Sequence, residues 1–236
     1  MPRLVESRLA LLESLEERYG PLPLPGAGPT SADSGETPFA SIARVALSLI
    51  AEPKVAATGF DALRQADLIE PKDLAEADPS EVDDAFREAR VRLSSRPLGP
   101  LQRIARWASG RDFDAEAVAG LSTEALREAW RGLNGVGPAT ADALLLFALG
   151  RSAYPVDRAS YRILVRHGWL DPSSDYDEAR SALEAIAPDD PAALAQLSLA
   201  FEKLGRDACK PSGPKCDRCP LRPLLPEGGP VGDEFA

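Results

Sequence analysis

The sequence predicts an all-α protein. Apolar residues recur at helical spacing among strong helix formers along most of the chain, whereas segments that alternate like β-strands are few. A length of 236 residues is enough to bury a substantial core, in one domain or in two closely packed lobes. Helices are expected over residues 3–19, 39–51, 60–66, 71–75, 80–90, 98–108, 115–119, 123–133, 138–149, 158–167, 176–187 and 191–207.

Local signals support individual helices in this series. The 39–51 helix carries apolar residues at Ile42, Val45 and Leu49, a spacing that favours a core face. Two Pro- and Gly-rich segments lie outside the helices: residues 21–38, which predict a flexible connection, and residues 223–236, which predict a loose tail. No sequence repeat is evident.

The segment Gly135-Val136-Gly137-Pro138 predicts a tight turn that leads into the 138–149 helix. Two glycines suit a turn with positive φ, and proline suits the first turn of a helix. The unpaired amides and positive dipole end of a helix N-terminus can hold a phosphate through backbone groups alone. An ordinary helix-hairpin turn explains this segment equally well when it is considered alone.

Asp157 precedes the next helix and is the candidate catalytic residue. Arg158, Arg162 and Arg166 follow at i, i+4 and i+8 spacing and form a cationic stripe on one helix face. Asp157 can also serve as an N-cap, and the two uses are compatible. A carboxylate at a helix N-terminus remains an anion and can stabilise a developing positive charge or activate water.

Together these segments resemble the helix-hairpin-helix and catalytic-aspartate segments of the endonuclease III superfamily of DNA glycosylases. Further landmarks are Arg18-Tyr19-Gly20-Pro21, Thr37-Pro38-Phe39 and residues 96–104, so the resemblance covers nearly the whole chain. It implies a two-lobed all-α fold with a helix-hairpin-helix motif and a C-terminal cysteine loop. Four segments are expected: an N-terminal helix and linker (1–38), a central helical domain (39–157), C-terminal helices that pack with the N-terminal segment (158–208), and the cysteine loop and tail (209–236).

The resemblance implies a base-excision repair enzyme that hydrolyses the N-glycosidic bond of a damaged base, with Asp157 assisting hydrolysis. The 154–177 segment is most similar to branches that contain 3-methyladenine glycosylases, which suggests alkylated bases as substrates. The partner implied is double-stranded DNA with a damaged or mismatched base, bound by a monomer. The DNA contacts expected are Gly135, Val136, Gly137, Ala139, Thr140, Arg162 and Arg166.

A departure at position 139 bears on the reaction type. Bifunctional members of the superfamily carry a Schiff-base lysine two residues after the second hairpin glycine, where this chain has Ala139. No lysine lies between Lys72 and Lys203. A monofunctional glycosylase without strand cleavage is therefore expected. An AP lyase that uses another amine, such as the N-terminus, is a third alternative.

The C-terminal cysteines resemble an iron-sulfur loop with one ligand missing. Cys209, Cys216 and Cys219 match the first three cysteines of the family's C-x6-C-x2-C-x5-C pattern, and Leu225 stands at the fourth position. The chain has only these 3 cysteines. Since [4Fe–4S] clusters normally have four thiolate ligands, the site is lost, completed by another ligand, or reduced to three thiolates. A zinc site completed by an oxygen ligand is a further alternative.

Two other features weigh against the superfamily's usual behaviour. The helix-end glutamine that probes the opened duplex is absent; Leu49 or Ile50 could act as an apolar wedge instead, although the periodicity favours core positions. The formal net charge of −10 repels DNA phosphates, while arginines outnumber carboxylates between residues 96 and 166. These arginines are Arg96, Arg103, Arg106, Arg111, Arg127, Arg131, Arg151, Arg158, Arg162 and Arg166.

The remaining expectations concern stacking, location and the rival function. Candidate residues for stacking on a flipped base are Trp107, Trp130, Phe147, Tyr154, Tyr161 and Trp169. No signal peptide or membrane-spanning segment is visible, so a cytoplasmic, nucleoid-associated protein is expected. The missing lysine, glutamine and fourth cysteine, with the acidic charge, motivate the alternative of a non-enzymatic DNA-binding relative.

Overall fold

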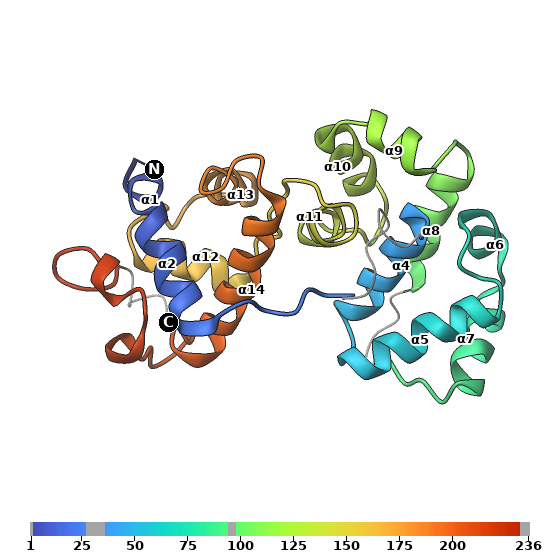
Figure 1. Ribbon diagram of the computed structural model, residues 1–236, viewed down its shortest axis with the longest axis horizontal. Helices are drawn as coiled ribbons and strands as arrows, with labels where there is room; N and C mark the ends of the chain where they lie inside the picture. The colour runs from blue at the N-terminus through green and yellow to red at the C-terminus, as the bar shows by residue number, and fades with distance from the viewer. Residues whose placement is uncertain (1, 27–35, 94–97, 232–236) are drawn as a thin grey trace. The chain divides into compact units, whose positions relative to one another are not determined.

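The computed structural model describes residues 2–26, 36–93 and 98–231, and all regular elements in these ranges are helices. The chain forms two compact units (Figure 1): Met1–Leu24 with Ser152–Ala236 is unit 1, and Pro25–Arg151 is unit 2. The all-α prediction is confirmed. Residues 27–35 of the expected linker, the landmarks Arg96 and Pro97, and residues 232–236 of the expected tail lie outside the described residues.

Unit 2 is built around a central helix, α4 (Pro38–Ser48). Phe39, Ile42 and Leu47 of α4 are fully buried, and the helix packs against α5 (Pro53–Gln65), α8 (Leu98–Ser109) and α11 (Pro138–Phe147). The Thr37 side chain caps α4 by accepting a hydrogen bond from the Ala40 amide at 3.2 Å. The other helices of unit 2 are α6 (Pro71–Glu76), α7 (Pro79–Glu88), α9 (Ala115–Gly120) and α10 (Thr123–Arg131).

The predicted helices are present, but several extents differ, and α4 and α13 (Tyr176–Glu184) end at Ser48 and Glu184 rather than at residues 51 and 187. Helix α5 begins at Pro53 rather than at residue 60, because Pro53 occupies the first helical turn and Gly59 lies inside the helix. Gly59 is buried, with side-chain atoms of Leu47, Phe86 and Val91 within 3.7 Å of an added Cβ, so packing overrides its poor helix propensity. The expected 3–19 helix is divided at Ser7 into two helices, α1 (Pro2–Glu6) and α2 (Arg8–Tyr19).

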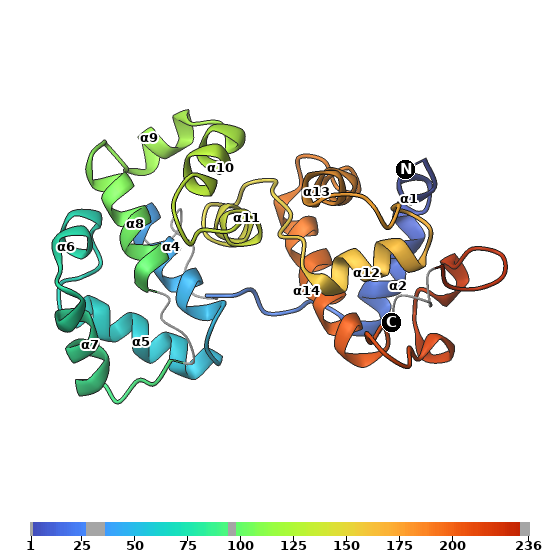
Figure 2. The same ribbon diagram turned by 180° about the vertical axis from the view of Figure 1, so that it is seen from behind.

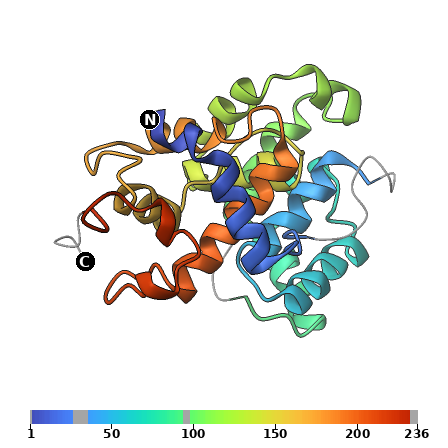
Figure 3. The same ribbon diagram turned by 60° about the vertical axis from the view of Figure 1, so that its left-hand side comes forward.

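Unit 1 is organised around α14 (Pro191–Asp207), which packs against α2 and against α12 (Arg158–Arg166), as Figures 2 and 3 show. Helix α13 (Tyr176–Glu184) and two short 3₁₀ helices, η1 (Cys216–Arg218) and η2 (Arg222–Leu224), complete the unit. Buried Leu204, Phe201 and Leu197 on α14 form part of its core. None of the described helices is long and apolar enough to traverse a bilayer.

The division between the units places the candidate aspartate, Asp157, in unit 1. Residues 152–157 belong to unit 1, whereas they were expected at the end of the central domain. Tyr154 is fully buried, and its backbone amide donates to the Glu184 carboxylate of α13 at 3.1 Å. These contacts fix the segment before α12 to unit 1.

A glycine permits the close approach of α12 and α14. A Cβ added to Gly205 would lie 2.4 Å from the Ala159 Cβ, a distance that real Cβ atoms do not reach. We expect Gly205→Ala to lower the free energy of unfolding by about 1–3 kcal/mol, because overpacking outweighs the better helix propensity of alanine. Chemical denaturation measures this loss. Adding Ala159→Gly should restore part of it, and an undiminished stability of the single variant would contradict this packing.

Candidate functional site

The hairpin Gly135–Thr140 lies between α10 and α11 in unit 2. Gly135 has φ +82°, a conformation that favours glycine, and the Val136 amide closes the turn on the Leu133 carbonyl at 3.0 Å. Val136 is buried, whereas Gly135 and Gly137 are exposed. Gly137 occupies the N-cap of α11 and provides no side-chain cap. The first-turn amides of α11, including those of Ala139 and Thr140, are therefore placed as a helix N-terminus requires for binding an anion.

A buried ion pair fixes α11 against α10. Arg127 Nε donates to Asp142 Oδ1 at 2.6 Å, and the two side chains are only 3% and 0% exposed. Arg127 also pairs with Glu124, which is largely exposed. Arg127 is one of the arginines between residues 96 and 166 that were considered as a basic, DNA-facing stretch. Because its side chain is buried, it is not available for a contact with DNA phosphate. The pair instead supports the helices on both sides of the hairpin.

Arg103 is a candidate binding residue that was not among the predicted DNA contacts. Its guanidinium nitrogen Nη1 lies 3.3 Å from the position of a Cβ added to Gly135, and 3.2 Å from one added to Gly99. The side chain is partly exposed and has no hydrogen-bonded or ion-paired partner among residues 2–26, 36–93 and 98–231. A cation therefore lies against the hairpin turn. Only the fold reveals it, since Arg103 is 32 positions before Gly135 in the sequence.

Asp157 is the N-cap of α12 in unit 1, and its side chain is exposed. Its Oδ1 accepts the Ser160 amide at 2.6 Å, and Ser160 Oγ lies 3.0 Å from the hydroxyl of buried Tyr154. The Val156 amide donates to the Tyr176 hydroxyl at 3.3 Å. The Ser160 amide thus orients the carboxylate, and the hydrogen bonds of Ser160 and Val156 hold the residues on either side of it.

The Tyr154 hydroxyl remains protonated beside this cap. Burial raises the pKa of Tyr154 far above its usual value, and the nearby charge of Asp157 raises it further. Tyr154 therefore acts as a neutral hydrogen-bonding support for Ser160 and not as an acid or base of its own. The predicted N-cap role of Asp157 is present in the structure, and it leaves the exposed carboxylate accessible to solvent.

The cationic stripe of α12 contacts the cysteine loop. Arg162 Nε donates to the Cys209 carbonyl at 2.8 Å. Arg166 is buried, and its guanidinium donates to the carbonyls of Lys210 and Pro211 at 2.6 and 3.0 Å. Arg166 was predicted to contact DNA, but its guanidinium instead hydrogen-bonds to the backbone of the cysteine loop. Arg162 is also hydrogen-bonded to this loop. Arg158 is the member of the stripe that is exposed.

The three cysteines and Leu225 line one small cavity in unit 1, together with His167 and Arg166. Its volume is about 10 Å³. Burial raises the pKa of the Cys219 thiol and lowers that of His167. Within the part of the chain that the structure describes, no three His, Cys, Asp or Glu side chains are arranged to hold a metal ion. Three thiols and a leucine do not provide the four thiolates of a [4Fe–4S] cluster, so the residues present do not fit this group.

Several expected roles for apolar and aromatic residues are corrected by burial. Trp130, Tyr154 and Trp169 are buried, which excludes them as exposed stacking platforms. Leu49, expected in the core, is 39% exposed at the C-cap of α4, because the helix ends at Ser48 and position 49 falls beyond its packed turns.

Two further aromatic candidates are engaged within the protein. The Tyr161 hydroxyl donates to the carbonyls of Pro172 and Ser174 at 2.7 and 3.1 Å. Trp107 packs edge-on against Phe113 and Trp130. Phe147 is partly buried. The burial of each aromatic side chain thus shows whether it is available for stacking on a base, which its position in the sequence does not.

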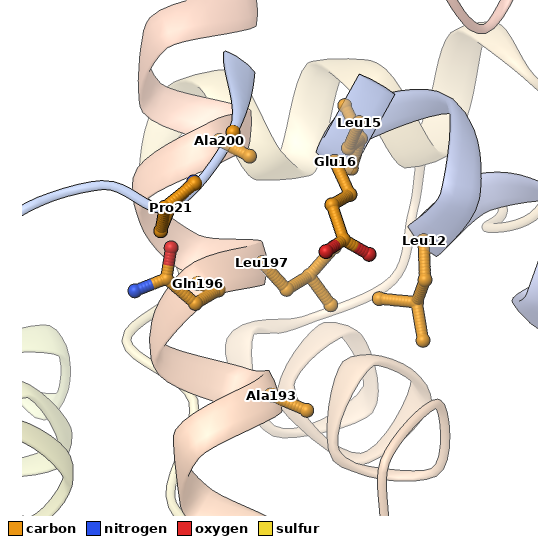
Figure 4. A pocket seen from close by; sticks show the side chains of 9 residues that line it. Leu12, Leu15, Glu16, Pro21, Ala193, Gln196, Leu197 and Ala200 are labelled. Atoms are coloured by element: carbon orange, nitrogen blue, oxygen red, sulfur yellow. The ribbon is translucent and has the colours of Figure 1, made fainter. Parts of the chain in front are cut away.

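Unit 1 also contains a larger cavity, of about 320 Å³, between α2 and α14 (Figure 4). Its walls are mainly apolar, and Gln196 and Glu16 contribute polar groups. The Gln196 amide is engaged by both backbone groups of Leu22, at 2.8 and 3.0 Å. None of the predicted site residues lines this cavity.

Comparisons with known proteins bear on this arrangement. No family model matches the chain. Endonuclease III of Sulfolobus acidocaldarius is 27% identical over 78% of this chain and 79% of its own length. Endonuclease III of Thermotoga maritima is 28% identical over 64% of this chain and 66% of its own length. Among solved structures, a non-covalent endonuclease III–DNA complex has a TM-score of 0.64 at 20% identity and covers 95% of this chain and 96% of that one.

The chain is thus similar in sequence to proteins named endonuclease III, and it shares the fold of the endonuclease III–DNA complex. The fold is also similar to that of a thermostable thymine-DNA glycosylase, with a TM-score of 0.63 at 17% identity over 100% of this chain and 98% of that one. The protein contains the hairpin in unit 2, and the capping aspartate and the loop with three cysteines in unit 1.

Proposed function

We propose that the protein is a monofunctional DNA glycosylase of base excision repair, in which Asp157 assists hydrolysis of the N-glycosidic bond of a damaged base. The observation that carries this proposal is the exposed Asp157 carboxylate, oriented by the Ser160 amide at the N-terminus of α12. In the reaction, water attacks C1′ as the bond from C1′ to the base nitrogen breaks. The carboxylate stabilises the oxocarbenium-like sugar and accepts the proton of the attacking water.

The proposed DNA contact is the hairpin Gly135–Thr140. The exposed turn and the uncapped amides of α11 bind phosphate without reading sequence, and Arg103 adds a positive charge at Gly135. The partner is double-stranded DNA with a damaged or mismatched base. The protein is proposed to act as a monomer. Because the proposed substrate is chromosomal DNA, the proposed location is the nucleoid of the cytoplasm.

Ala139 supports hydrolysis without strand cleavage. A solved structure with a TM-score of 0.62 is a trapped covalent endonuclease III–DNA intermediate. In this chain the hairpin position of the Schiff-base lysine is alanine, and the five lysines are Lys54, Lys72, Lys203, Lys210 and Lys215. The chain therefore lacks an amine at the hairpin position where, by the resemblance, covalent catalysis requires one.

Alkylated bases are the proposed substrate class. Besides the sequence resemblance of residues 154–177, two structural neighbours are 3-methyladenine DNA glycosylases, from Helicobacter pylori and Schizosaccharomyces pombe. Their TM-scores are both 0.55, at 16% and 21% identity. Loss of the bond to an alkylated purine is chemically easier because the modified base is a better leaving group, and opening a damaged pair costs less than opening an intact one.

Duplex oligonucleotides with alkylated, deaminated, oxidised or mismatched bases test this function. Strand breaks that appear only after alkali treatment are expected for at least one alkylated base, with no protein–DNA adduct after borohydride reduction. Breaks without alkali and a borohydride-trapped adduct would establish a lyase instead. Bound DNA without base loss from any duplex would favour the non-enzymatic DNA-binding relative, which the missing glutamine, lysine and fourth cysteine motivate.

Substituting Arg103 should weaken DNA binding without changing the fold. We expect Arg103→Gln to reduce affinity and to lower the slope of log K against log salt concentration by about 1, because one phosphate contact is lost. Fluorescence anisotropy across a salt series measures the slope. Arg64→Gln is a matched control, since Arg64 is exposed and pairs with Asp61 on the same helix, α5. Equal slopes for the Arg103 variant and the native protein would exclude this contact.

Leu49 is the proposed wedge in place of the missing glutamine. A partly exposed leucine at the end of α4 can insert between bases. We expect Leu49→Ala to slow base release by about 10-fold, equivalent to roughly 1.4 kcal/mol, while the protein remains folded at the assay temperature. Leu9→Ala is the control, because Leu9 is 65% exposed on α2. Unchanged single-turnover rates for Leu49→Ala would remove it from the site.

A further inference from the structure

The cysteine loop, residues 209–225, encloses too little space for an iron-sulfur cluster. Cys209, Cys216, Cys219 and Leu225 surround a cavity of about 10 Å³. One buried water needs roughly 10–15 Å³ on this scale, whereas a cluster contains eight heavy atoms. The position that would supply the fourth thiolate instead contributes an apolar side chain to the cavity wall.

We propose that the cysteine loop is a metal-free structural element, in which Leu225 fills the position of a metal ligand and α12 holds the loop by hydrogen bonds. The inference is independent of the proposed glycosylase reaction. It requires that the bonds to α12 and the loop's own packing are sufficient to keep the loop folded.

The basic side chains of α12 provide the first part of this support. Arg162 donates to the Cys209 carbonyl, and Arg166 donates to the carbonyls of Lys210 and Pro211. Arg166 Nη1 also lies 3.5 Å from Cys209 Sγ. Hydrogen bonds from a charged donor are roughly twice as strong as neutral ones, and Arg166 is 4% exposed. The loop's first turn is thus fixed to the helix at several backbone atoms.

The second half of the loop is anchored by an apolar side chain and a histidine. Leu221 is fully buried, and its carbonyl lies 3.3 Å from His167 Nε2. His167 Nδ1 lies 2.8 Å from the Ile163 carbonyl, and the ring stacks on Trp169 with 4.4 Å between centroids. The Val231 amide donates to the Arg166 carbonyl at 2.8 Å beyond the loop. Contacts to α12 therefore hold both ends of the cysteine segment.

Metal analysis of the full-length protein tests the proposal. The protein is purified anaerobically from cells supplied with iron and zinc, and its iron, zinc and acid-labile sulfide are measured beside its visible absorption spectrum. We expect no stoichiometric metal or sulfide, and the same melting temperature with and without EDTA. Stoichiometric iron with sulfide, or stoichiometric zinc whose removal lowers the melting temperature, would overturn the proposal.

Two kinds of substitution separate a metal site from a hydrogen-bonded loop. Arg166→Gln should lower the melting temperature more than Cys216→Ser, because Cys216 is partly exposed and its thiol is not needed as a ligand. A metal-dependent loop requires the opposite order, since loss of one of three thiolates would release the metal. If Arg166→Gln does not fold, the metal content of the native protein and the melting temperature of Cys216→Ser still decide the question.

Discussion

Replacing Asp157 by asparagine is expected to slow base release by about 10²–10⁴-fold while leaving the fold and DNA binding intact. The loss arises because the amide is neutral and can neither stabilise the positive sugar nor accept a proton from water. Asparagine is as good an N-cap as aspartate, so the hydrogen bond to the Ser160 amide can be retained. Single-turnover rates on a duplex with the released base measure the effect, and thermal melting measures the fold.

A second capping aspartate in unit 1 provides the matched control. Asp190 caps α14 by accepting the Ala193 amide at 2.9 Å, and it is exposed as Asp157 is. Asp190→Asn should therefore leave the rate of base release unchanged. Similar rates for Asp157→Asn and the native protein would refute the catalytic role of Asp157. If both variants lose the same fraction of the rate of base release, the effect arises from the change at a helix cap and not from catalysis by Asp157.

Removing Asp142 should be the most destabilising of the substitutions considered. Asp142→Ala leaves the buried Arg127 guanidinium without its buried carboxylate partner, and breaking such a pair typically costs about 3–5 kcal/mol. Urea denaturation of the native and variant proteins measures the difference. Asp142→Asn should cost less, because the amide oxygen can still accept a hydrogen bond from Arg127.

An exposed ion pair supplies the comparison for this prediction. Glu202 and Arg206 of α14 are 2.8 Å apart, with side chains 50% and 68% exposed, so Glu202→Ala should change stability by less than about 1 kcal/mol. Replacing Arg127 and Asp142 together with leucines should cost less than Asp142→Ala alone, because no buried charge then remains unpaired. A loss below about 1 kcal/mol for Asp142→Ala would contradict the buried pair.

The helices and the hairpin could be predicted because their signals are local. Proline at the first helical turn marks α4, α11 and α14, and the two glycines of the hairpin mark its turn. The Asp157 N-cap is likewise a local feature, set by a hydrogen bond to a residue three positions later. Periodicity and capping chemistry are properties of short segments, so they can be inferred without knowing the tertiary structure.

The partners of charged residues could not be predicted in the same way. Spacing showed that Arg158, Arg162 and Arg166 share one helix face, but not that this face covers a loop more than 40 residues away. Arg127 was counted with the basic residues between positions 96 and 166, although it pairs with Asp142 in the core. Sequence spacing defines a face, whereas long-range packing decides what that face contacts.

The most direct test of the central claim is mass-spectrometric detection of free base after the protein is incubated with duplex DNA containing 3-methyladenine or another alkylated purine. The duplex without the lesion and the Asp157→Asn variant are the controls. The proposed function predicts free alkylated base together with an intact strand that breaks only on alkali treatment. Absence of free base from every alkylated duplex, while the protein binds those duplexes, would contradict it.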